Sequence, residues 1–571
     1  MFTTKQTQLI DRKPTAKVAS VASNVNASPF VKAGLKKSAE ILSGNLAVKL
    51  RTTGSPFVDQ FAKLGSFKAP RPFAEIESDA ELQWAEDPLN TVKFALYLRT
   101  ITRKVQLPDG TTTEEPQKGG ELKHESIMRM LWLNQKAPET FWKNIGLFVA
   151  LGSWHDIFTM LQYDLVYNGW AKRTLNWKNF GDLILTALSN PKTLDLVKKY
   201  LPQIKSNSQC NTVESQANNI IAKWVCSLVF GNKESSFNYK SYRKLKSSGT
   251  AHQWQQLISQ KKFDEIDFAK IHGRALNLLV RSKFLFNQKL SDKYKAWVTK
   301  PETTLKYTGF VHELFANLPS VVDTWGRSTG GGLSKVDENT RETINKQFAT
   351  LVEKGKANGT TSLIVVRDTS GSMGSIATGT NMTCYDIGKA LALYFSEFLK
   401  GSFANSFMEF NDDAKMHTWA GSTPLEKWFN DKTSHVGSTN FESVVKLFAR
   451  IKNQGVDESE FPTGILCISD SEFNPATLSS TNVESSKQIL RNAGFSEDYV
   501  SNFVIVLWNL QSSYYGKGTG EKFESWKDTP NVFYFGGYSA STISFLSDKI
   551  KNAEELFQAA MEQEILSRVE L

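Results

Sequence analysis

The sequence predicts two folded parts, an α-helical region followed by an α/β domain with a mostly parallel, doubly wound sheet. In the first part, short helical patterns follow one another between Pro, Gly or Asn. From Thr361 onward, apolar runs of strand length alternate with helical stretches, which is the pattern of a parallel sheet. A chain of 571 residues is long enough for two or three domains. We expect a polar segment over 1–56, a helical-repeat domain over 57–325, a linker and connecting helix over 326–358, and the α/β domain over 359–571.

The helical patterns of the first part predict an α-solenoid, although no exact repeat period is visible. Each pattern places apolar residues at helical spacing, and together they cover 91–99, 124–133, 140–151, 154–163, 181–188, 193–200 and 214–229. A polar insertion over 107–120 predicts a loop. The glycine run at 326–332 lacks the Gly-Lys-Ser/Thr ending of a P-loop, so it predicts a flexible connection rather than a nucleotide site.

The α/β domain is expected to contain six strands with helices between them. The strands are predicted over 361–367, 406–410, 414–419, 464–469, 503–508 and 532–535. Helices are predicted over 385–399, 441–451 and 486–492, with a closing helix near 541–566. The segment between 471 and 502 shows no clear strand pattern.

Oxygen-bearing side chains follow two of these strands and precede one of the helices. Asp368, Ser370 and Ser372 come directly after the first strand, Thr439 lies in a polar turn, and Asp470 ends a later strand. Ligands of open α/β sheets bind at the carboxyl ends of the strands. Two carboxylates and three hydroxyls suit Mg²⁺ or Mn²⁺ better than zinc, with a position left for water or for an acidic group of a partner. Arg367 departs from the apolar strand, and alternation should point its side chain away from Asp368.

Composition excludes several classes of protein. The hydrophobic content of 40% and aromatic content of 12% indicate a folded chain. The four cysteines form no CxxC pair, so we expect reduced core thiols and a cytoplasmic location. The sequence has no HExxH motif, no apolar stretch of transmembrane length and no signal-peptide core at its start, which predicts neither a zinc enzyme nor a membrane protein. With no histidine or lysine close to the metal loops in sequence as a general base, we expect neither an enzyme nor a small-molecule substrate.

Charge is distributed unevenly along the chain. Residues 1–350 hold 49 Lys and Arg against 31 Asp and Glu, whereas residues 351–571 hold 19 against 27. Within 201–300 the ratio is 17 to 6, with aromatic residues interleaved, which suits phosphate neutralisation and base stacking on single-stranded nucleic acid. The open alternative is ordinary solvated helix faces with Phe and Tyr in the core. The candidate contact residues are Lys240, Tyr242, Arg243, Lys244, Lys246, Lys261, Lys262, Arg274, Arg281 and Lys283.

The metal loops resemble the metal-ion-dependent adhesion site (MIDAS) of von Willebrand factor A domains, which has an Asp-x-Ser-x-Ser loop, a Thr and an Asp. The order of a helical domain and then an A domain is similar to the TROVE family, best known from the Ro ribonucleoprotein autoantigen, with relatives in viruses, bacteria and plants. The similarity spans about residues 85–560. Its motifs are LYLR at 96–99, GG at 119–120, ALGSWHDI at 150–157, AKW at 222–224, YRK at 242–244, FDEIDFAKI at 263–271, DTSGSM at 368–373, ISDSEF at 468–473 and FGGYSA at 535–540.

The resemblance implies a HEAT-repeat-like helical ring closed by the A domain. It further implies binding of structured or misfolded noncoding RNA, with single-stranded ends near the metal site. A second hypothesis treats the helical part as scaffold, so that an acidic group of a partner protein completes the metal site. The chain would then be an interaction or assembly module, such as a virion or storage component. Trp154 is open to two interpretations, a core residue or a stacking platform.

Overall fold

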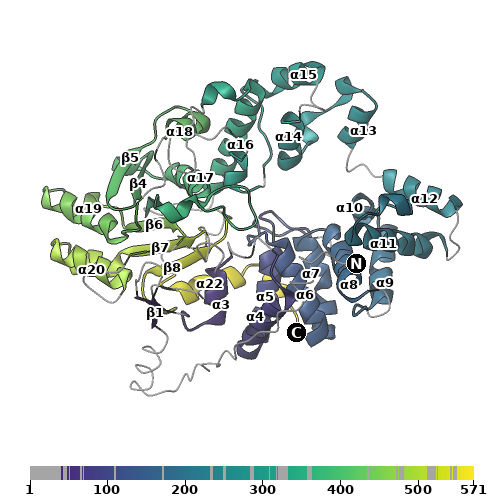
Figure 1. Ribbon diagram of the computed structural model, residues 1–571, viewed down its shortest axis with the longest axis horizontal. Coiled ribbons are helices and arrows are strands. Elements are labelled where there is room, and N and C mark those ends of the chain that lie inside the picture. Colours follow the sequence, from purple (N-terminus) through teal and green to yellow (C-terminus); the bar gives the residue numbers. More distant parts are fainter. Residues whose placement is uncertain are drawn as a thin grey trace.

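The chain folds into an arc of helices and an α/β domain that contact each other at both ends of the arc (Figure 1). The computed structural model describes the backbone of 40–42 and 48–50, which form the short antiparallel pair β1 (Glu40–Leu42) and β2 (Val48–Leu50). It then describes 52–571 except 65–66, 68–69, 108–110, 170–172, 232–235, 249–252, 283–287, 308, 317, 319–331, 357–362, 432, 434–436, 471–472, 475–480, 511–522, 524, 540–542, 544 and 546–549. Most of the predicted segments 1–56 and 326–332 therefore lies outside the described residues.

The first part is helix-rich, as predicted, and each helical pattern named above falls within an observed helix. Its helices are α3 (Pro56–Phe61), α4 (Phe73–Glu86), α5 (Pro88–Arg99), α6 (Lys123–Lys136), α7 (Pro138–Leu151), α8 (Trp154–Asn168), α9 (Trp177–Ser189), α10 (Pro191–Tyr200), α11 (Val213–Phe230), α12 (Ser236–Ser247), α13 (Gln253–Ser259), α14 (Gly273–Val280), α15 (Gln288–Val298) and the connecting helix α16 (Glu338–Lys356). The predicted loop at 107–120 contains isolated β-bridges, one of which pairs Arg103 with Gln117.

Side chains at the helix starts explain where several helices begin. The Asp87 side chain accepts a hydrogen bond from the Asn90 backbone N–H, and Pro88 occupies the first helical position of α5, where its missing N–H costs nothing. Proline also opens α7 and α10. Thr212 and Ser215 cap the start of α11 reciprocally.

The α/β domain contains a six-stranded mixed sheet in the order β5-β4-β3-β6-β7-β8. The strands are β3 (Leu363–Asp368), β4 (Ser406–Phe410), β5 (Ala414–Thr418), β6 (Gly464–Ser469), β7 (Val504–Asn509) and β8 (Val532–Gly536). All neighbours pair in parallel except β4 and β5, which form an antiparallel edge. Each strand matches its predicted range within two residues. The central strand β3 lies between β4 and β6 and is parallel to both. The polar residues after β3 and β6 therefore meet at the carboxyl ends of the strands.

Helices lie on both sides of this sheet (Figure 1). The helices α19 (Glu442–Asn453) and α20 (Asn482–Asn492) pack against each other on one side, and α17 (Cys384–Ser396) and α22 (Ala553–Met561) lie on the other. The remaining helices of the domain are α18 (Pro424–Asn430) and α21 (Glu497–Asn502). Within the predicted closing helix near 541–566, α22 covers Ala553–Met561, and most of 541–549 lies outside the described residues.

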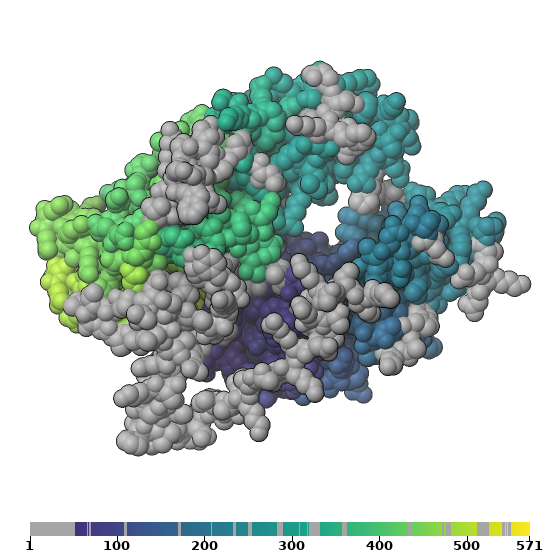
Figure 2. Space-filling model, in the orientation of Figure 1, coloured from purple at the N-terminus to yellow at the C-terminus, as the bar shows by residue number. Residues whose placement is uncertain are grey.

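The helical arc closes on the α/β domain through two aromatic seams. At its start, α3 packs on β8 and α22, and the Phe57 and Phe557 rings stack with centroids 5.1 Å apart. At its end, α16 packs on α18, and the turn η7 (Val311–Leu314) packs on α17. Beside that turn, the Phe315 and Trp428 rings stack at 4.4 Å. Figure 2 shows an opening through the molecule between the α14–α15 region and the helices at the start of the arc.

The buried side chains form two separate cores. The larger one runs continuously from the helices at the start of the arc into the sheet. The smaller one belongs to the α13–α15 region and includes Phe268, Leu276 and Tyr294. The four cysteines, Cys210, Cys226, Cys384 and Cys467, are buried free thiols, which confirms the prediction of reduced core residues. Among the described residues, no helix combines the length and the apolar character needed to cross a bilayer.

Candidate metal centre and basic surfaces

Asp368 ends the central strand β3 and is completely buried. Its Oδ1 accepts a hydrogen bond of 2.8 Å from the Ser370 backbone N–H, and its Oδ2 accepts one of 2.5 Å from the Ser469 hydroxyl. The parallel register aligns Arg367 with Ile468, which places Ser469 beside Asp368 and Asp470 one residue beyond. Both carboxylates therefore sit at the same edge of the sheet, on adjacent strands.

Hydrogen bonds connect the three predicted metal loops. The Gly371 N–H of the first loop donates to the Gly437 carbonyl of the second loop at 3.1 Å. The second and third loops are joined at Thr439, whose carbonyl accepts from the Asn474 N–H at 2.8 Å and whose N–H donates to the Asn474 side chain at 3.3 Å. Gly437 has a φ of +95°, and a Cβ there would lie 2.6 Å from an Asp412 carboxylate oxygen, so this turn requires glycine.

The hydroxyl groups of the first loop also lie together. The Ser370 and Ser372 hydroxyl oxygens are 3.1 Å apart, with Ser372 in the short turn η9 (Gly371–Gly374). Ser370, Thr439 and Asp470 are all buried. Burial raises the pKa of the Cys384 thiol, and Asp470 and Asp368 raise it further, so both carboxylates lie close to one thiol. The described contacts thus bring the loops that carry all five candidate ligands together.

This donor set fits a hard divalent cation. Burial raises the pKa of Asp368 to about 6, and no described lysine or arginine pairs with it, so a cation would favour its charged form. Among the described residues, no three acidic, histidine or cysteine side chains gather as metal ligands. Three of the five candidate ligands are hydroxyl groups, a set that suits a hard cation better than zinc.

Arg367 points away from the candidate metal centre, as strand alternation predicts. Its guanidinium is fully buried, with 2.6 Å to an Asp431 carboxylate oxygen and 3.6 Å to Glu409. It also lies 4.8 Å from the centroid of the Phe407 ring. Burial would raise the pKa of Asp431, but Arg367 and Lys389 hold it well below its usual range. The positive charge of Arg367 is therefore compensated on the opposite side of the strand.

The candidate RNA-contacting residues fall into distinct environments. Tyr242 is fully buried, and its hydroxyl donates to the Pro202 carbonyl at 2.9 Å, so its ring cannot stack on a base; this candidate is corrected to a core residue. Lys246 donates to the Leu201 carbonyl, and Arg281 to the Leu314 and Ala316 carbonyls. Arg274 forms a bidentate pair with Glu313 and Lys262 pairs with Glu265, whereas Lys261 is exposed. Lys283 lies outside the described residues.

Three candidates remain on one exposed face of α12. Lys240, Arg243 and Lys244 stand at positions i, i+3 and i+4, so they share a helix face, and all three are exposed. None of them pairs with an acidic side chain among the described residues. We call this face the α12 basic strip.

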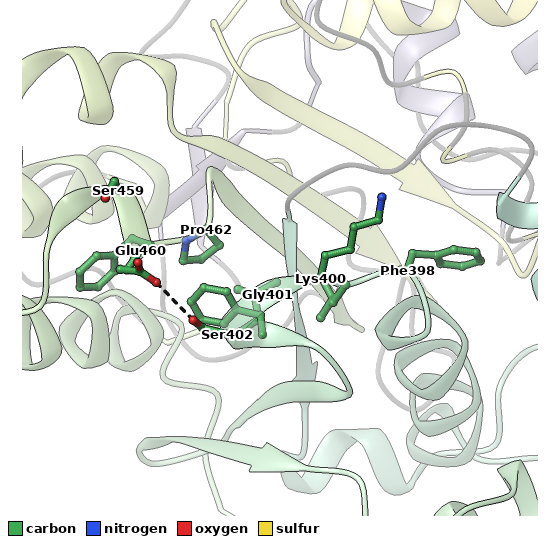
Figure 3. A pocket seen from close by; sticks show the side chains of 11 residues that line it. Phe398, Lys400, Gly401, Ser402, Ser459, Glu460 and Pro462 are labelled. Carbon is green, nitrogen blue, oxygen red and sulfur yellow. Dashed lines mark hydrogen bonds between the residues drawn. The ribbon is translucent and has the colours of Figure 1, made fainter.

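In the described part of the chain, cavities also lie away from the metal loops. One, of about 240 Å³, is at the opposite edge of the sheet, where Lys400, Ser402 and Glu460 line it together with apolar side chains (Figure 3). There the Ser402 hydroxyl donates to Glu460 at 3.2 Å. Another cavity, of about 510 Å³, lies in the helical arc beside α8 and was not foreseen from the sequence.

Comparison with known families gives one match. A family model described as a domain of unknown function, DUF7788, matches residues 362–569, which is the α/β domain from its first strand onward. No curated protein matches the chain. The matched range contains all five candidate metal ligands and none of the candidate RNA contacts.

Proposed function

We propose that the protein binds structured or misfolded noncoding RNA in the manner of the TROVE family, through a basic, HEAT-like α-solenoid joined to an A-type domain. The observation that supports this most is the closure of the helical arc on the α/β domain at both seams, around an opening in the molecule (Figure 2). The helical part carries the basic excess, and the α/β domain is acidic. RNA would therefore be attracted to the arc and repelled from the sheet.

We further propose that the metal loops hold Mg²⁺ or Mn²⁺ in a MIDAS-type centre. Asp368, Ser370 and Ser372 would bind it from the first loop, Thr439 from the second and Asp470 from the third. The bound cation would supply an electrophilic position for an anionic oxygen. The buried hydrogen bonds to Asp368 hold its carboxylate in place before the cation arrives. We propose no enzymatic activity, and a cytoplasmic location suits the four buried free thiols.

The α12 basic strip supplies a test of RNA binding. Changing Lys240, Arg243 and Lys244 together to Gln should weaken RNA binding and reduce the slope of log Kobs against log[salt] by up to about 2 to 3, since each phosphate contact contributes roughly 0.7 in single strands and 0.9 in duplexes. The measurement is fluorescence anisotropy with a structured RNA over a salt series. The matched control changes three exposed lysines of the α/β domain, Lys400, Lys415 and Lys551, to Gln.

Comparing the two triple variants distinguishes a specific contact at the α12 basic strip from a general effect of net charge. Equal losses in both triple variants would show that net charge alone governs binding and that the strip is no contact surface. If the unmodified protein shifts no RNA at low salt, RNA binding itself is refuted.

A second candidate function is a metal-dependent interaction module, in which an acidic side chain of a partner protein completes the metal centre. The observation that favours it is Ile376, an apolar side chain that is 57% exposed four residues after Ser372. An apolar residue beside a cation suits a protein ligand better than a phosphate. Partner capture that requires Mg²⁺ and is lost in Ile376→Ser, with RNA binding unchanged, would favour this function.

A further inference from the structure

The larger cavity, of about 510 Å³, lies between α8, the segment after α10 and the start of α11. Its lining includes His155 and Thr159 from α8, Tyr200 at the end of α10, Lys205 from the segment after it, and Thr212, which caps the start of α11. Its volume lies within the range of small-molecule sites, roughly 300 to 1,000 Å³. It is separate from the α12 basic strip and from the metal loops.

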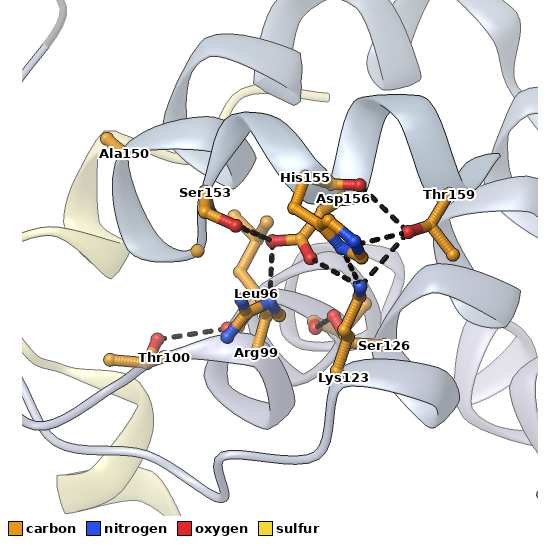
Figure 4. Close-up of polar contacts among 12 residues, drawn as sticks. Leu96, Arg99, Thr100, Lys123, Ser126, Ala150, Ser153, His155, Asp156 and Thr159 are labelled. Carbon is orange, nitrogen blue, oxygen red and sulfur yellow. Dashed lines mark hydrogen bonds and ion pairs between the residues drawn. The ribbon is translucent and has the colours of Figure 1, made fainter. Parts of the chain in front are cut away.

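Two basic side chains, Arg99 and Lys123, gather around Asp156 beside His155 and Thr159, which line this cavity (Figure 4). Arg99 pairs with the buried Asp156 at 2.8 Å, and Lys123 Nζ lies 3.6 Å from the other oxygen of the same carboxylate. Lys123 Nζ also donates to the Thr159 hydroxyl at 3.0 Å and contacts His155 Nδ1. Because a charged lysine can only donate, His155 Nδ1 must accept, which leaves its Nε2 as a hydrogen-bond donor.

Arg103 is a third basic side chain in this neighbourhood. Its guanidinium donates to the Ala150 and Gly152 carbonyls, each at 3.0 Å, at the end of α7. Burial lowers the pKa of Arg103, the charge of Arg99 lowers it further, and Tyr200 acts in the opposite direction. Arg103 therefore adds positive charge to this neighbourhood, although it does not itself line the cavity.

The cluster carries more positive charge than the surrounding protein compensates. Arg99 and Lys123 share one carboxylate, that of Asp156, and Arg103 donates to backbone carbonyls instead. Burial lowers the pKa of Lys123, which shows that its charged form is held in a partly desolvated place. One acidic residue, Glu214, lines the far side of the cavity, where Lys205 lies as well, so the basic surplus remains. A bound anion would remove this imbalance.

An aromatic surface accompanies the positive charge. The Tyr200 ring is partly exposed and meets the His155 ring edge to face, with centroids 5.6 Å apart. Lys199 Nζ lies 5.0 Å from the Tyr200 centroid. Base stacking on aromatic side chains beside cations is the common mode of single-strand recognition.

We propose that this cavity binds one nucleotide, with its phosphate on the His155 Nε2–H and on Lys123, whose ammonium contacts the lining side chains His155 and Thr159, and with its base against Tyr200. The proposal rests on the proposed RNA-binding function and adds to it a defined subsite for a single-stranded nucleotide. The same chemistry would accept a free nucleotide, and the experiment below distinguishes the two sources.

The test uses the full-length protein, a fluorescent 12-nucleotide oligouridine and anisotropy over a salt series. Lys123→Gln should reduce the salt slope by roughly 0.7, because one phosphate contact is lost. Tyr200→Leu should weaken binding about 5-fold or more at fixed salt while leaving the slope unchanged, because it removes stacking and no charge. Lys192→Gln, an exposed lysine on α10 outside the cavity, should change neither quantity.

Each outcome supports or overturns the subsite. If the unmodified protein and both variants bind oligouridine with equal affinity and slope, the subsite is refuted and the proposed function survives. If the unmodified protein binds no RNA, the proposed function fails, and uridine 5′-monophosphate decides the subsite by calorimetry. If the unmodified protein binds uridine 5′-monophosphate and Tyr200→Leu does not, the cavity is a free-nucleotide site. If the unmodified protein does not bind uridine 5′-monophosphate, the subsite is refuted. Should Lys123→Gln unfold, as a thermal scan would show, His155→Gln replaces it and should weaken binding without changing the salt slope.

Discussion

Replacing Asp368 with Asn is expected to abolish Mg²⁺ and Mn²⁺ binding while the fold stays intact. Asparagine keeps the size of the side chain and its acceptor for the Ser370 N–H, but it removes the negative charge from this candidate metal ligand. Loss of one hydrogen-bonding partner behind a ligand typically costs 10- to 100-fold in metal affinity, and loss of a carboxylate ligand should cost at least about 100-fold. Asp470→Asn should give the same result.

Isothermal titration with MgCl₂ and MnCl₂ measures this effect, and circular dichroism checks the fold. The matched control is Asp498→Asn, which removes the same charge from the exposed start of α21. An unchanged titration curve in either Asp368→Asn or Asp470→Asn would refute the metal assignment. In the absence of metal, Asp368→Asn should not lower the thermal midpoint at pH 7, because it replaces a carboxylate whose ionisation is opposed by burial.

Replacing Arg367 with Met is expected to destabilise the α/β domain by about 3 to 5 kcal/mol, because it leaves buried carboxylates without their cation. Asp431 and Glu409 are 6% and 7% exposed and both face this guanidinium. Lys389, whose pKa burial lowers to about 8, cannot replace it fully. The measurement is the midpoint of thermal and urea unfolding, with and without Mg²⁺.

The control for this prediction is Arg450→Met, which breaks an exposed pair with Asp413. Both side chains of that pair are more than half exposed, and such pairs contribute less than about 1 kcal/mol. A destabilisation of Arg367→Met no larger than that of Arg450→Met would show that the buried pair contributes little.

The strands, and the meeting of the metal loops at the carboxyl ends of the strands, could be predicted from the sequence. The strands follow from local apolar patterns, and the meeting place follows from the rule that open α/β sheets bind ligands at the carboxyl ends of their strands. Apolar runs identified all six strands of the sheet, and parallel pairing brings the ends of β3 and β6 together. Several helix starts were placed two or three residues late. Pro88, Pro138 and Pro191 were interpreted as separators, although proline favours the first helical position.

The basic surfaces could be predicted only in part. Lysines and aromatic residues alternate along α12, and composition alone does not show which face is buried. The spacing of Tyr239, Tyr242 and Leu245 at every third residue was the available signal for a core-facing side, and it leaves Lys240 and Arg243 on the other. The cluster around Asp156 was beyond such reasoning, because Arg99, Lys123 and Tyr200 come from three helices far apart in the sequence.

The two aromatic seams affect the solubility of the α/β domain when it is separated from the helical arc. Phe557 packs against Phe57, Phe61 and Phe94 of the helical arc, and Trp428 stacks on Phe315. If the α/β domain were produced alone, the apolar side chains of both aromatic seams would be exposed to water. Exposed apolar surface of this kind favours self-association. We therefore expect residues 362–569, the range matched by DUF7788, to be less soluble alone than when joined to the helical arc.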